Sequence, residues 1–407
     1  MKRYDSYKDS GTIWFNEVPK NWIVTKIKYF CYKVVNGATP STNNPSYWDG
    51  DIPWIPSGMC HDCEIVEADK FITEEGYCNS STKKIPANTT LVALTGATCS
   101  KTGYLLFESC TNQSIAALIN RNGTFSKYFF YLLQSLRPQL LTYQTGGAQA
   151  GVNVGNCKNL IGLFPSYKEQ KNICSYLDTK CGEVDKVIST QEKRISLLQE
   201  LKQSIITHAV TKGLNPDVKM KDSGIEWIGE VPEHWDCAPF KRFMNIKNGQ
   251  DYKSFQSDDG YPVIGSGGCF AYCTRFIYDG ESLLLGRKGT IDKPLYVNGK
   301  FWTVDTMFYS IPQKNCSVRY MYYQSLTIPF ERYYTSTALP SMTQTDLGLN
   351  NFCFPPIPEQ QEIASYLDKR CAQIDASISK AQKEIELLQE YKQSLITEVV
   401  TGKRKVC

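Results

Sequence analysis

The sequence has few groups that could carry out chemistry on their own. It contains only three histidines, His61, His208 and His234, and they lie in three different segments. Their spacing indicates neither a catalytic triad nor a metal cluster. A phosphate-binding loop of the form G-x-x-x-x-G-K-[ST] is also missing, because segment 96–103 has its glycines in the wrong order. These absences favour a binding or assembly protein over an enzyme.

Long apolar runs are missing as well. No stretch approaches the 18 apolar residues of a membrane helix, and residues 1–5 lack the apolar run of a signal peptide. We therefore expect a soluble, cytoplasmic protein whose 16 cysteines are reduced thiols used as small apolar side chains. One C-x-x-C motif, Cys60 to Cys63, has no second pair at zinc spacing. We expect no metal there.

Two internal repeats dominate what is present. Ser-Tyr-Leu-Asp at 175–178 recurs at 365–368, and Leu-Leu-Gln-Glu at 197–200 recurs at 387–390, at a constant offset of 190 residues. Both copies carry apolar residues at heptad spacing, which predicts two long helices that pack as an antiparallel coiled coil. At about 1.5 Å per residue, each helix would span roughly 50 Å. The seam residues are Leu177, Val184, Ile188, Ile195 and Leu198 in the first copy, and Leu367, Ile374, Ile378, Ile385 and Leu388 in the second.

A second repeat precedes each helix. Lys-Asp-Ser-Gly at 8–11, followed by Val-Pro and Trp22, recurs at 221–224 with Trp235, at an offset of 213 residues. The two offsets differ, so the segments between the repeated elements differ in length while the elements themselves are kept. We predict an α/β (α+β) fold with this order of parts: a first domain at 1–165, a helix at 166–212, a linker and repeated motif at 213–235, a second domain at 236–358 and a second helix at 359–407.

Short elements can be predicted inside both domains. Segments 90–94, 115–119, 282–285 and 301–304 are short apolar runs of the kind that form buried strands. Segments 125–141 and 317–326 have helical spacing of apolar residues. Basic residues are interleaved with aromatic ones around Tyr252 and Phe255, and Arg287 and Lys288 follow an apolar strand, a pattern typical of nucleic-acid contacts. The net charge is only +4, so such contacts would form a local patch.

Several motifs resemble the specificity subunit of Type I restriction–modification enzymes. Gly-Ala-Thr-Pro at 37–40 and Tyr-Trp-Asp-Gly-Asp-Ile-Pro-Trp-Ile at 47–55 resemble the opening of that family's target recognition domain. Segments 285–291 and 304–308 are similar to its later strands. Pro-Pro-Ile-Pro-Glu-Gln-Gln-Glu-Ile at 355–363 matches the family's exit motif, and the first copy departs from it by losing the second proline after Pro165. The resemblance covers nearly the whole chain.

The resemblance implies a function without catalysis in this chain. Two target recognition domains would each recognise one half of a split site in double-stranded DNA, and the helices would set the spacing. The helices would also bind two modification (methyltransferase) subunits, which use S-adenosylmethionine for adenine methylation. Restriction (endonuclease and translocase) subunits would use ATP and magnesium. This chain itself would then hold no cofactor and no metal.

We expect polar loops, rather than helices, to contact the DNA, because Arg and Gln can form bidentate contacts with base edges and Lys more often meets phosphate. The candidate residues are Tyr47, Lys101, Gln149 and Asn153 in the first domain, and Tyr252, Ser266, Arg287, Lys288, Thr343 and Gln344 in the second. Two alternatives stay open at this stage. One is a coiled-coil scaffold with two divergent ligand-binding domains, and the other is a methyltransferase whose cofactor motif has drifted, faintly suggested by Asn-Pro-Ser-Tyr at 44–47.

Overall fold

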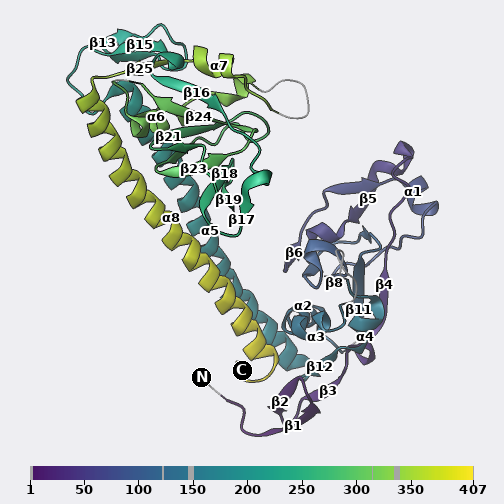
Figure 1. The fold of residues 1–407 in the computed structure, drawn as a ribbon. Coiled ribbons are helices and arrows are strands. Elements are labelled where there is room, and N and C mark those ends of the chain that lie inside the picture. The colour runs from purple at the N-terminus through teal and green to yellow at the C-terminus, as the bar shows by residue number, and fades with distance from the viewer. Residues whose placement is uncertain (1–2, 122, 145–150, 314, 334–339, 407) are drawn as a thin grey trace. The chain divides into compact units, whose positions relative to one another are not determined.

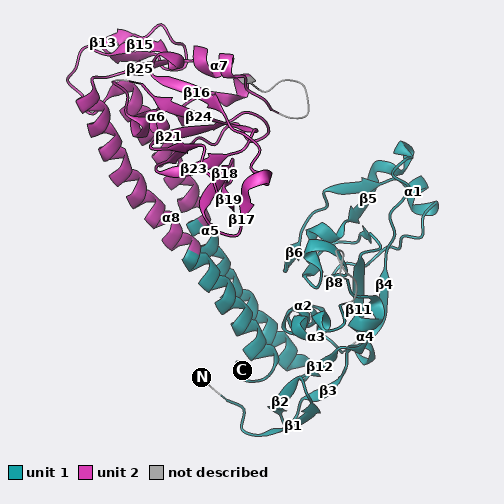
Figure 2. Cartoon of the chain, viewed as in Figure 1, with its two compact units in different colours: residues 1–191, 383–407 teal, residues 192–382 magenta. Residues whose placement is uncertain are grey.

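The computed structural model describes residues 3–121, 123–144, 151–313, 315–333 and 340–406. The chain forms two compact units, one made of residues 1–191 and 383–407 and the other of residues 192–382 (Figure 2). Each unit contains one mixed helix and sheet domain together with a stretch of both long helices (Figure 1). The predicted mixed fold, with two long helices and two sheet domains, is confirmed.

The two long helices are α5 (Tyr167–Lys212) and α8 (Ile357–Val400). Each ends at a glycine with positive φ, Gly213 at 76° and Gly402 at 74°, because a left-handed residue satisfies the last carbonyls of a helix. In the first unit, Asp185 lies 2.6 Å from Lys392 Nζ, and Gln191 Nε2 donates to Glu384 at 3.0 Å. In the second unit, Asp375 lies 2.7 Å from Lys202 Nζ. Residue numbers rise on α5 as they fall on α8, so the predicted antiparallel pairing is confirmed.

The heptad seam is buried most deeply toward the sheet domains. Leu177 and Val184 are buried in the first unit, and Leu367, Ile374 and Ile378 are buried in the second. The remaining seam residues are only half-buried, because two helices alone cannot cover them completely. These half-buried residues are Ile188, Ile195, Leu198, Ile385 and Leu388.

The first unit is built on two sheets. The five-stranded sheet has the order β4 (Cys31–Asn36), β11 (Ile115–Asn120), β8 (Thr89–Ala93), β9 (Thr102–Leu105), β6 (Cys63–Ile65), and the three-stranded sheet has the order β10 (Cys110–Thr111), β5 (Trp48–Ile55), β7 (Lys70–Ile72). Two strand pairs are β1 (Tyr7–Thr12) with β2 (Phe15–Pro19), and β3 (Ile23–Lys26) with β12 (Ile161–Phe164). The short helices are α1 (Glu74–Cys78), α2 (Ser126–Ser135), α3 (Arg137–Leu141) and α4 (Val154–Asn159), with 3-10 turns at 27–29, 45–47, 57–59 and 96–98. The predicted strands 90–94 and 115–119 are confirmed, and the predicted helix 125–141 is divided in two at Leu136.

The second unit repeats this plan with different strands. Its four-stranded sheet has the order β16 (Met244–Asn248), β24 (Met307–Pro312), β21 (Ser282–Gly286), β22 (Leu295–Val297), and its five-stranded sheet has the order β17 (Gln256–Ser257), β19 (Gly268–Cys273), β18 (Tyr261–Gly265), β23 (Lys300–Thr303), β20 (Tyr278–Asp279). The two strand pairs are β13 (Met220–Asp222) with β14 (Glu230–Pro232), and β15 (Asp236–Pro239) with β25 (Asn351–Phe354). The helices are α6 (Val318–Ser325) and α7 (Gln344–Leu349), with 3-10 turns at 240–242, 253–255 and 330–333. The predicted strands 282–285 and 301–304 and the predicted helix 317–326 are confirmed.

The repeated motif before each domain covers the end of a long helix. Trp22 is buried against Gly402 at the end of α8, and Trp235 is buried against Gly213 at the end of α5. Polar contacts close the same junctions: Tyr7 Oη donates to the Gly402 carbonyl at 3.0 Å, and Lys212 Nζ donates to the Glu230 carbonyl at 2.6 Å. The second repeat found in the sequence is therefore a helix-end cover that recurs in both units.

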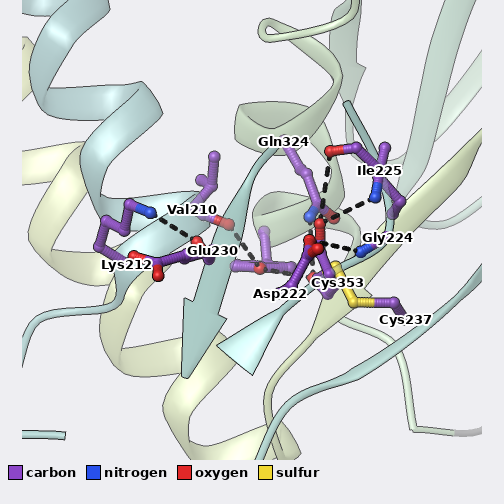
Figure 3. Close-up of a disulfide and its surroundings, with 11 residues drawn as sticks. Val210, Lys212, Asp222, Gly224, Ile225, Glu230, Cys237, Gln324 and Cys353 are labelled. Atoms are coloured by element: carbon purple, nitrogen blue, oxygen red, sulfur yellow. Dashed lines mark hydrogen bonds between the residues drawn. A yellow bond between two sulfur atoms is a disulfide. The ribbon is translucent and has the colours of Figure 1, made fainter. Parts of the chain in front are cut away.

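A disulfide corrects the expectation that all cysteines are reduced. Cys237 on β15 and Cys353 on β25 are directly opposed in an antiparallel pair and are bonded to each other (Figure 3). The equivalent positions in the first unit, opposed on β3 and β12, are Val24 and Leu163. Cysteine at both opposed positions brings the two sulfur atoms together, which composition could not reveal. The other cysteines among the described residues are free thiols.

Candidate nucleic-acid interface

Both domains open with a glycine that admits no other residue. A Cβ on Gly37 would lie 1.7 Å from the Thr111 carbonyl oxygen, and a Cβ on Gly249 would lie 2.0 Å from the Val304 carbonyl oxygen. The next carbonyl in each loop is held by a buried tryptophan. Trp54 Nε1 donates to the carbonyl of residue 38 at 3.0 Å, and Trp302 Nε1 donates to the carbonyl of residue 250 at 2.8 Å. The two divergent domains thus fix their opening loops in the same way.

In the second unit, Arg287 and Lys288 follow the end of β21 and are held by backbone contacts. Both of their amides donate to the Thr306 carbonyl, at 2.8 and 3.4 Å. The Arg287 carbonyl accepts from the Met342 amide at 3.0 Å, and Lys288 forms a β-bridge with Ser341. The Lys288 side chain is exposed and that of Arg287 is half-buried. This anchoring presents two cations from a fixed backbone.

Thr343 and Gln344 lie directly after that junction, at the start of α7. The Thr343 hydroxyl accepts from the Asp346 amide at 3.1 Å and so caps the helix, while Gln344 Nε2 donates to the Ile246 carbonyl at 3.1 Å. Both residues are exposed overall. The structure therefore brings four of the six candidates of the second domain together, although Thr343 has a capping role that polarity alone did not indicate.

The first unit has the same junction with other residues. The Val152 amide donates to the Leu94 carbonyl at 2.9 Å, and Thr95 forms a β-bridge with Gly151. Asn153 then caps α4, accepting from the Asn156 amide at 3.0 Å. Lys101 lies on the other side of the same turn, where its carbonyl accepts from the Ala93 amide at 2.9 Å. The Lys101 side chain lines a cavity that α5 and α8 also border, whereas Asn153 lies at the junction itself, and candidate Gln149 lies outside the described residues.

The remaining candidates lie in a second group. Tyr252 makes an edge contact with Phe270 at 5.5 Å between ring centroids, and Ser266 lies in the turn between β18 and β19 that carries Phe270. Phe270 is 56% exposed. Tyr47 in the first unit ends a 3-10 turn beside β5, where its carbonyl accepts from the Thr73 amide. Ser266 adjoins the five-stranded sheet of the second unit, whereas Arg287 follows a strand of the four-stranded sheet. Tyr47 adjoins the three-stranded sheet of the first unit, whereas Lys101 precedes a strand of the five-stranded sheet.

The exposed cationic and amide side chains of the second domain suit a nucleic acid, which has anionic phosphates and polar base edges. Lys247 is exposed near the end of β16, which is separated by β24 from β21, the strand that Arg287 and Lys288 follow. It adjoins Ile246, the partner of Gln344. Lysine can neutralise phosphate, Arg can donate two hydrogen bonds to a guanine edge, and Gln can donate one to an adenine edge and accept another from it.

Sequence reasoning missed the residues that join each domain to the helices. The Tyr128 hydroxyl on α2 lies 2.8 Å from the Leu163 carbonyl of β12 and 3.5 Å from the Val400 carbonyl of α8. The Tyr320 hydroxyl on α6 lies 3.0 Å from the Cys353 carbonyl of β25 and 3.4 Å from the Val210 carbonyl of α5. Lys-Tyr-x-x-Tyr at 127–131 recurs as Arg-Tyr-x-x-Tyr at 319–323, at an offset of 192 residues. This third repeat could have indicated the two tyrosines from the sequence, but it is too short to stand out from chance similarity.

Two features are absent from the part of the chain that the structure describes. Within 3–121, 123–144, 151–313, 315–333 and 340–406, no helix combines the length and apolar character that a membrane crossing requires. Across that part of the chain, no three His, Cys, Asp or Glu side chains are grouped as metal ligands. At the C-x-x-C motif, Cys60 is buried and Cys63 is exposed.

The known proteins that are similar to this chain in sequence or in fold all relate to type I restriction systems. The family described as "Type I restriction modification DNA specificity domain" matches residues 19–199 and 232–387. The Type I restriction enzyme MjaIX specificity subunit of Methanocaldococcus jannaschii is 23% identical over 429 residues, covering 96% of this chain and 95% of that protein. The EcoR124I/EcoR124II specificity subunit of Escherichia coli is 25% identical over 236 residues, covering 56% of this chain and 52% of that protein.

A solved structure concerned with complex assembly and conformational transition of the type I R-M system contains a chain of the same fold. That chain superposes with a TM-score of 0.72 at 15% identity, covering 95% of this chain and 99% of its own length. This likeness concerns the fold alone. Because the family matches both sheet domains and much of both long helices, the chain belongs to the Type I restriction modification DNA specificity domain family.

Proposed function

We propose that this chain recognises a bipartite site in double-stranded DNA, with each sheet domain recognising one half. The observation that carries the proposal is the paired construction of the two domains. Each uses an obligatory glycine and a buried tryptophan to fix its opening loop, and each places polar residues at one strand junction. The supports are the same while the exposed residues differ, as two domains with different target sequences require.

The exposed residues give each domain its chemistry. In the second domain, Arg287 and Gln344 can form bidentate contacts with guanine and adenine, and Lys288 and Lys247 can neutralise phosphates. In the first domain, we assign the corresponding role to Lys101 and Asn153. We assign the DNA contacts to these loops and to the group formed by Tyr252, Ser266 and Phe270.

We further propose that the chain works as a subunit and leaves catalysis to its partners. Modification subunits would bind along the helix pair and bring S-adenosylmethionine for adenine methylation, and restriction subunits would bring ATP and magnesium. Exposed apolar residues on the helices support such a docking role, because charged solvent-facing positions would be expected on helices without a partner. The most exposed of them are Leu197, Leu201, Leu387 and Tyr391.

The assignment can be tested by DNA binding of the assembled complex over a range of salt concentrations. Lys288→Ala should weaken binding and lower the slope of log K against log salt by about one, as the loss of one phosphate contact predicts. Arg287→Ala should cost about 1–3 kcal/mol and relax the preference at one base pair. Lys219→Ala removes an exposed lysine beside β13 and serves as the matched control. Unchanged affinity and salt slope in both test variants would refute the assignment.

A further inference from the structure

An aspartate on each long helix accepts a hydrogen bond from a tyrosine and pairs with a cationic side chain, both of which belong to the neighbouring sheet domain. In the first unit, Tyr131 Oη on α2 donates to Asp178 Oδ1 on α5 at 2.6 Å. Lys127, also on α2, lies 2.7 Å from Asp178 and 2.5 Å from Glu64 on β6. Lys127 therefore connects a strand of the sheet domain to the long helix through two ion pairs.

The second unit builds the same contact with an arginine. Tyr323 Oη on α6 donates to Asp368 Oδ1 on α8 at 2.6 Å, and Arg319 donates to the same oxygen through Nε at 2.7 Å. The Arg319 guanidinium lies over the Tyr296 ring, 4.6 Å from its centroid, and Tyr296 in turn donates to Glu281. A chain of contacts again runs from a carboxylate of the sheet domain to an aspartate of the long helix.

These two aspartates, which we call the aspartate anchors, occupy equivalent positions of the 190-residue repeat. A buried glutamine accompanies each of them. Gln170 Oε1 accepts from the Phe125 amide at the start of α2, and Gln360 Oε1 accepts from the Ser317 amide at the start of α6, both at 2.9 Å. The joint between domain and helix is thus the same in both units, although the strands beyond it differ.

The ionic contacts of the first anchor persist at neutral pH. Partial burial by itself lowers the pKa of Lys127, but the hydrogen bonds with Asp178 and Glu64 outweigh it and the pKa is raised. Burial, with the bond to Asp178, raises the pKa of Tyr131, so its hydroxyl keeps its proton. Both groups are therefore donors at any pH at which the protein would bind DNA.

Apolar packing is incomplete beside this anchor. An open cavity of about 570 Å³ lies between the loop and strand 61–64 of the sheet domain and the α5 segment 178–185. Lys127 and Asp178 form part of its wall. On the other side of the anchor, Tyr131 packs with Leu177 and Cys181 in one buried cluster. Across the cavity the sheet domain and the helix are not in close contact, so the polar anchor restricts the angle between them on the side where apolar packing is missing.

We infer that Asp178 and Asp368 are positioning residues that fix the angle of each recognition domain on the helix pair, and thereby the single spacing at which both half-sites are recognised together. The inference rests on the proposed function. A domain with angular freedom would still recognise its own half-site, because its loops are unchanged. Joint binding would become weaker, since a flexible connection lowers the effective concentration of the second domain at its half-site.

The test uses the chain purified with its partner subunits and a library of random-sequence duplexes, from which bound DNA is selected and sequenced. Wild type should select two constant half-sites at one spacing. Asp178→Asn and Asp368→Asn should select the same bases at more than one spacing, and bind the wild-type site roughly tenfold more weakly. A duplex that carries only one half-site should bind equally well to wild type and variants.

Three controls accompany the anchor variants. Lys127→Arg should behave as wild type, because Arg319 fills that role in the second unit. Asp185→Asn and Asp375→Asn remove ion pairs between the two helices and leave the hydrogen bonds of Asp178 and Asp368 in place, so they should keep the single spacing.

Two results would overturn the inference. One is a single spacing with wild-type affinity in both anchor variants. The other is loss of the bases of one half-site, which would mean that the anchors support the fold of a domain rather than its placement. If wild type selected no bipartite site at all, the proposed function would fail first.

Discussion

Removing one leucine at three levels of burial should measure how much the helix pair contributes to stability. Leu367 is fully buried where α8 meets the second sheet domain, Leu198 is half-buried in the seam, and Leu197 is 64% exposed. All three lie in the same compact unit, so their effects can be compared in one unfolding transition. The three substitutions to alanine are chemically identical and differ only in the environment that they change.

The expected losses follow from burial. Leu367→Ala leaves a cavity among close-packed side chains and should cost about 2–5 kcal/mol. Leu198→Ala removes a side chain that is only partly buried, and it should cost less, roughly 1–2 kcal/mol. Leu197→Ala should stay within about 0.5 kcal/mol, as should Lys383→Ala on the solvent side of α8.

A urea titration followed by circular dichroism measures these differences as shifts of the midpoint at a constant slope. The reasoning would be refuted if Leu197→Ala cost as much as Leu367→Ala, because the helices would then face each other with a different register.

Two buried thiols, the disulfide and the length of the helices each give a further prediction. Burial raises the pKa of the Cys31 and Cys157 thiols to about 12, so the unfolded chain releases these protons first as pH rises. Urea stability should therefore fall above about pH 9 by about 1.4 kcal/mol per pH unit for each thiol, and Cys157→Ala should reduce that slope. Reduction of the Cys237–Cys353 disulfide should lower the free energy of unfolding by roughly 2–5 kcal/mol. The double variant Cys237→Val with Cys353→Leu carries the residue pair of the first unit, and its urea midpoint should be independent of reductant. Insertion of one heptad after Leu198 and another after Leu388 adds about 10.5 Å to each helix. Methylation mapping should then show roughly three more base pairs between the two recognised half-sites. An unchanged distance between the half-sites would contradict the spacing role of the helices.

The repeats made the helices and their pairing predictable from sequence. Identity at a constant offset marked equivalent positions, and heptad spacing marked the inward face, as the burial of Leu177 and Leu367 illustrates. Buried strands such as β8 and β21 were also predictable, because short apolar runs have few other solutions. These features depend on periodicity, which a single sequence contains.

Contacts between distant segments were not predictable in the same way. Asp178 and Asp368 are polar residues on helices, and their sequence neighbours do not indicate that Tyr131 and Tyr323 will donate to them. The polarity of Thr343 and Asn153 predicts DNA contacts, whereas in the structure their side-chain oxygens cap helices. Polarity alone cannot distinguish a cap from a ligand contact.

Exchange of residues 236–358 for the second domain of another family member tests the central claim most directly. Genome-wide methylation would be mapped in cells that carry the partner subunits with either the native or the exchanged chain. Our account predicts that one half of the methylated site changes while the other half and the spacing remain. A change in both halves, or a native site without two separated halves, would contradict recognition by two independent domains.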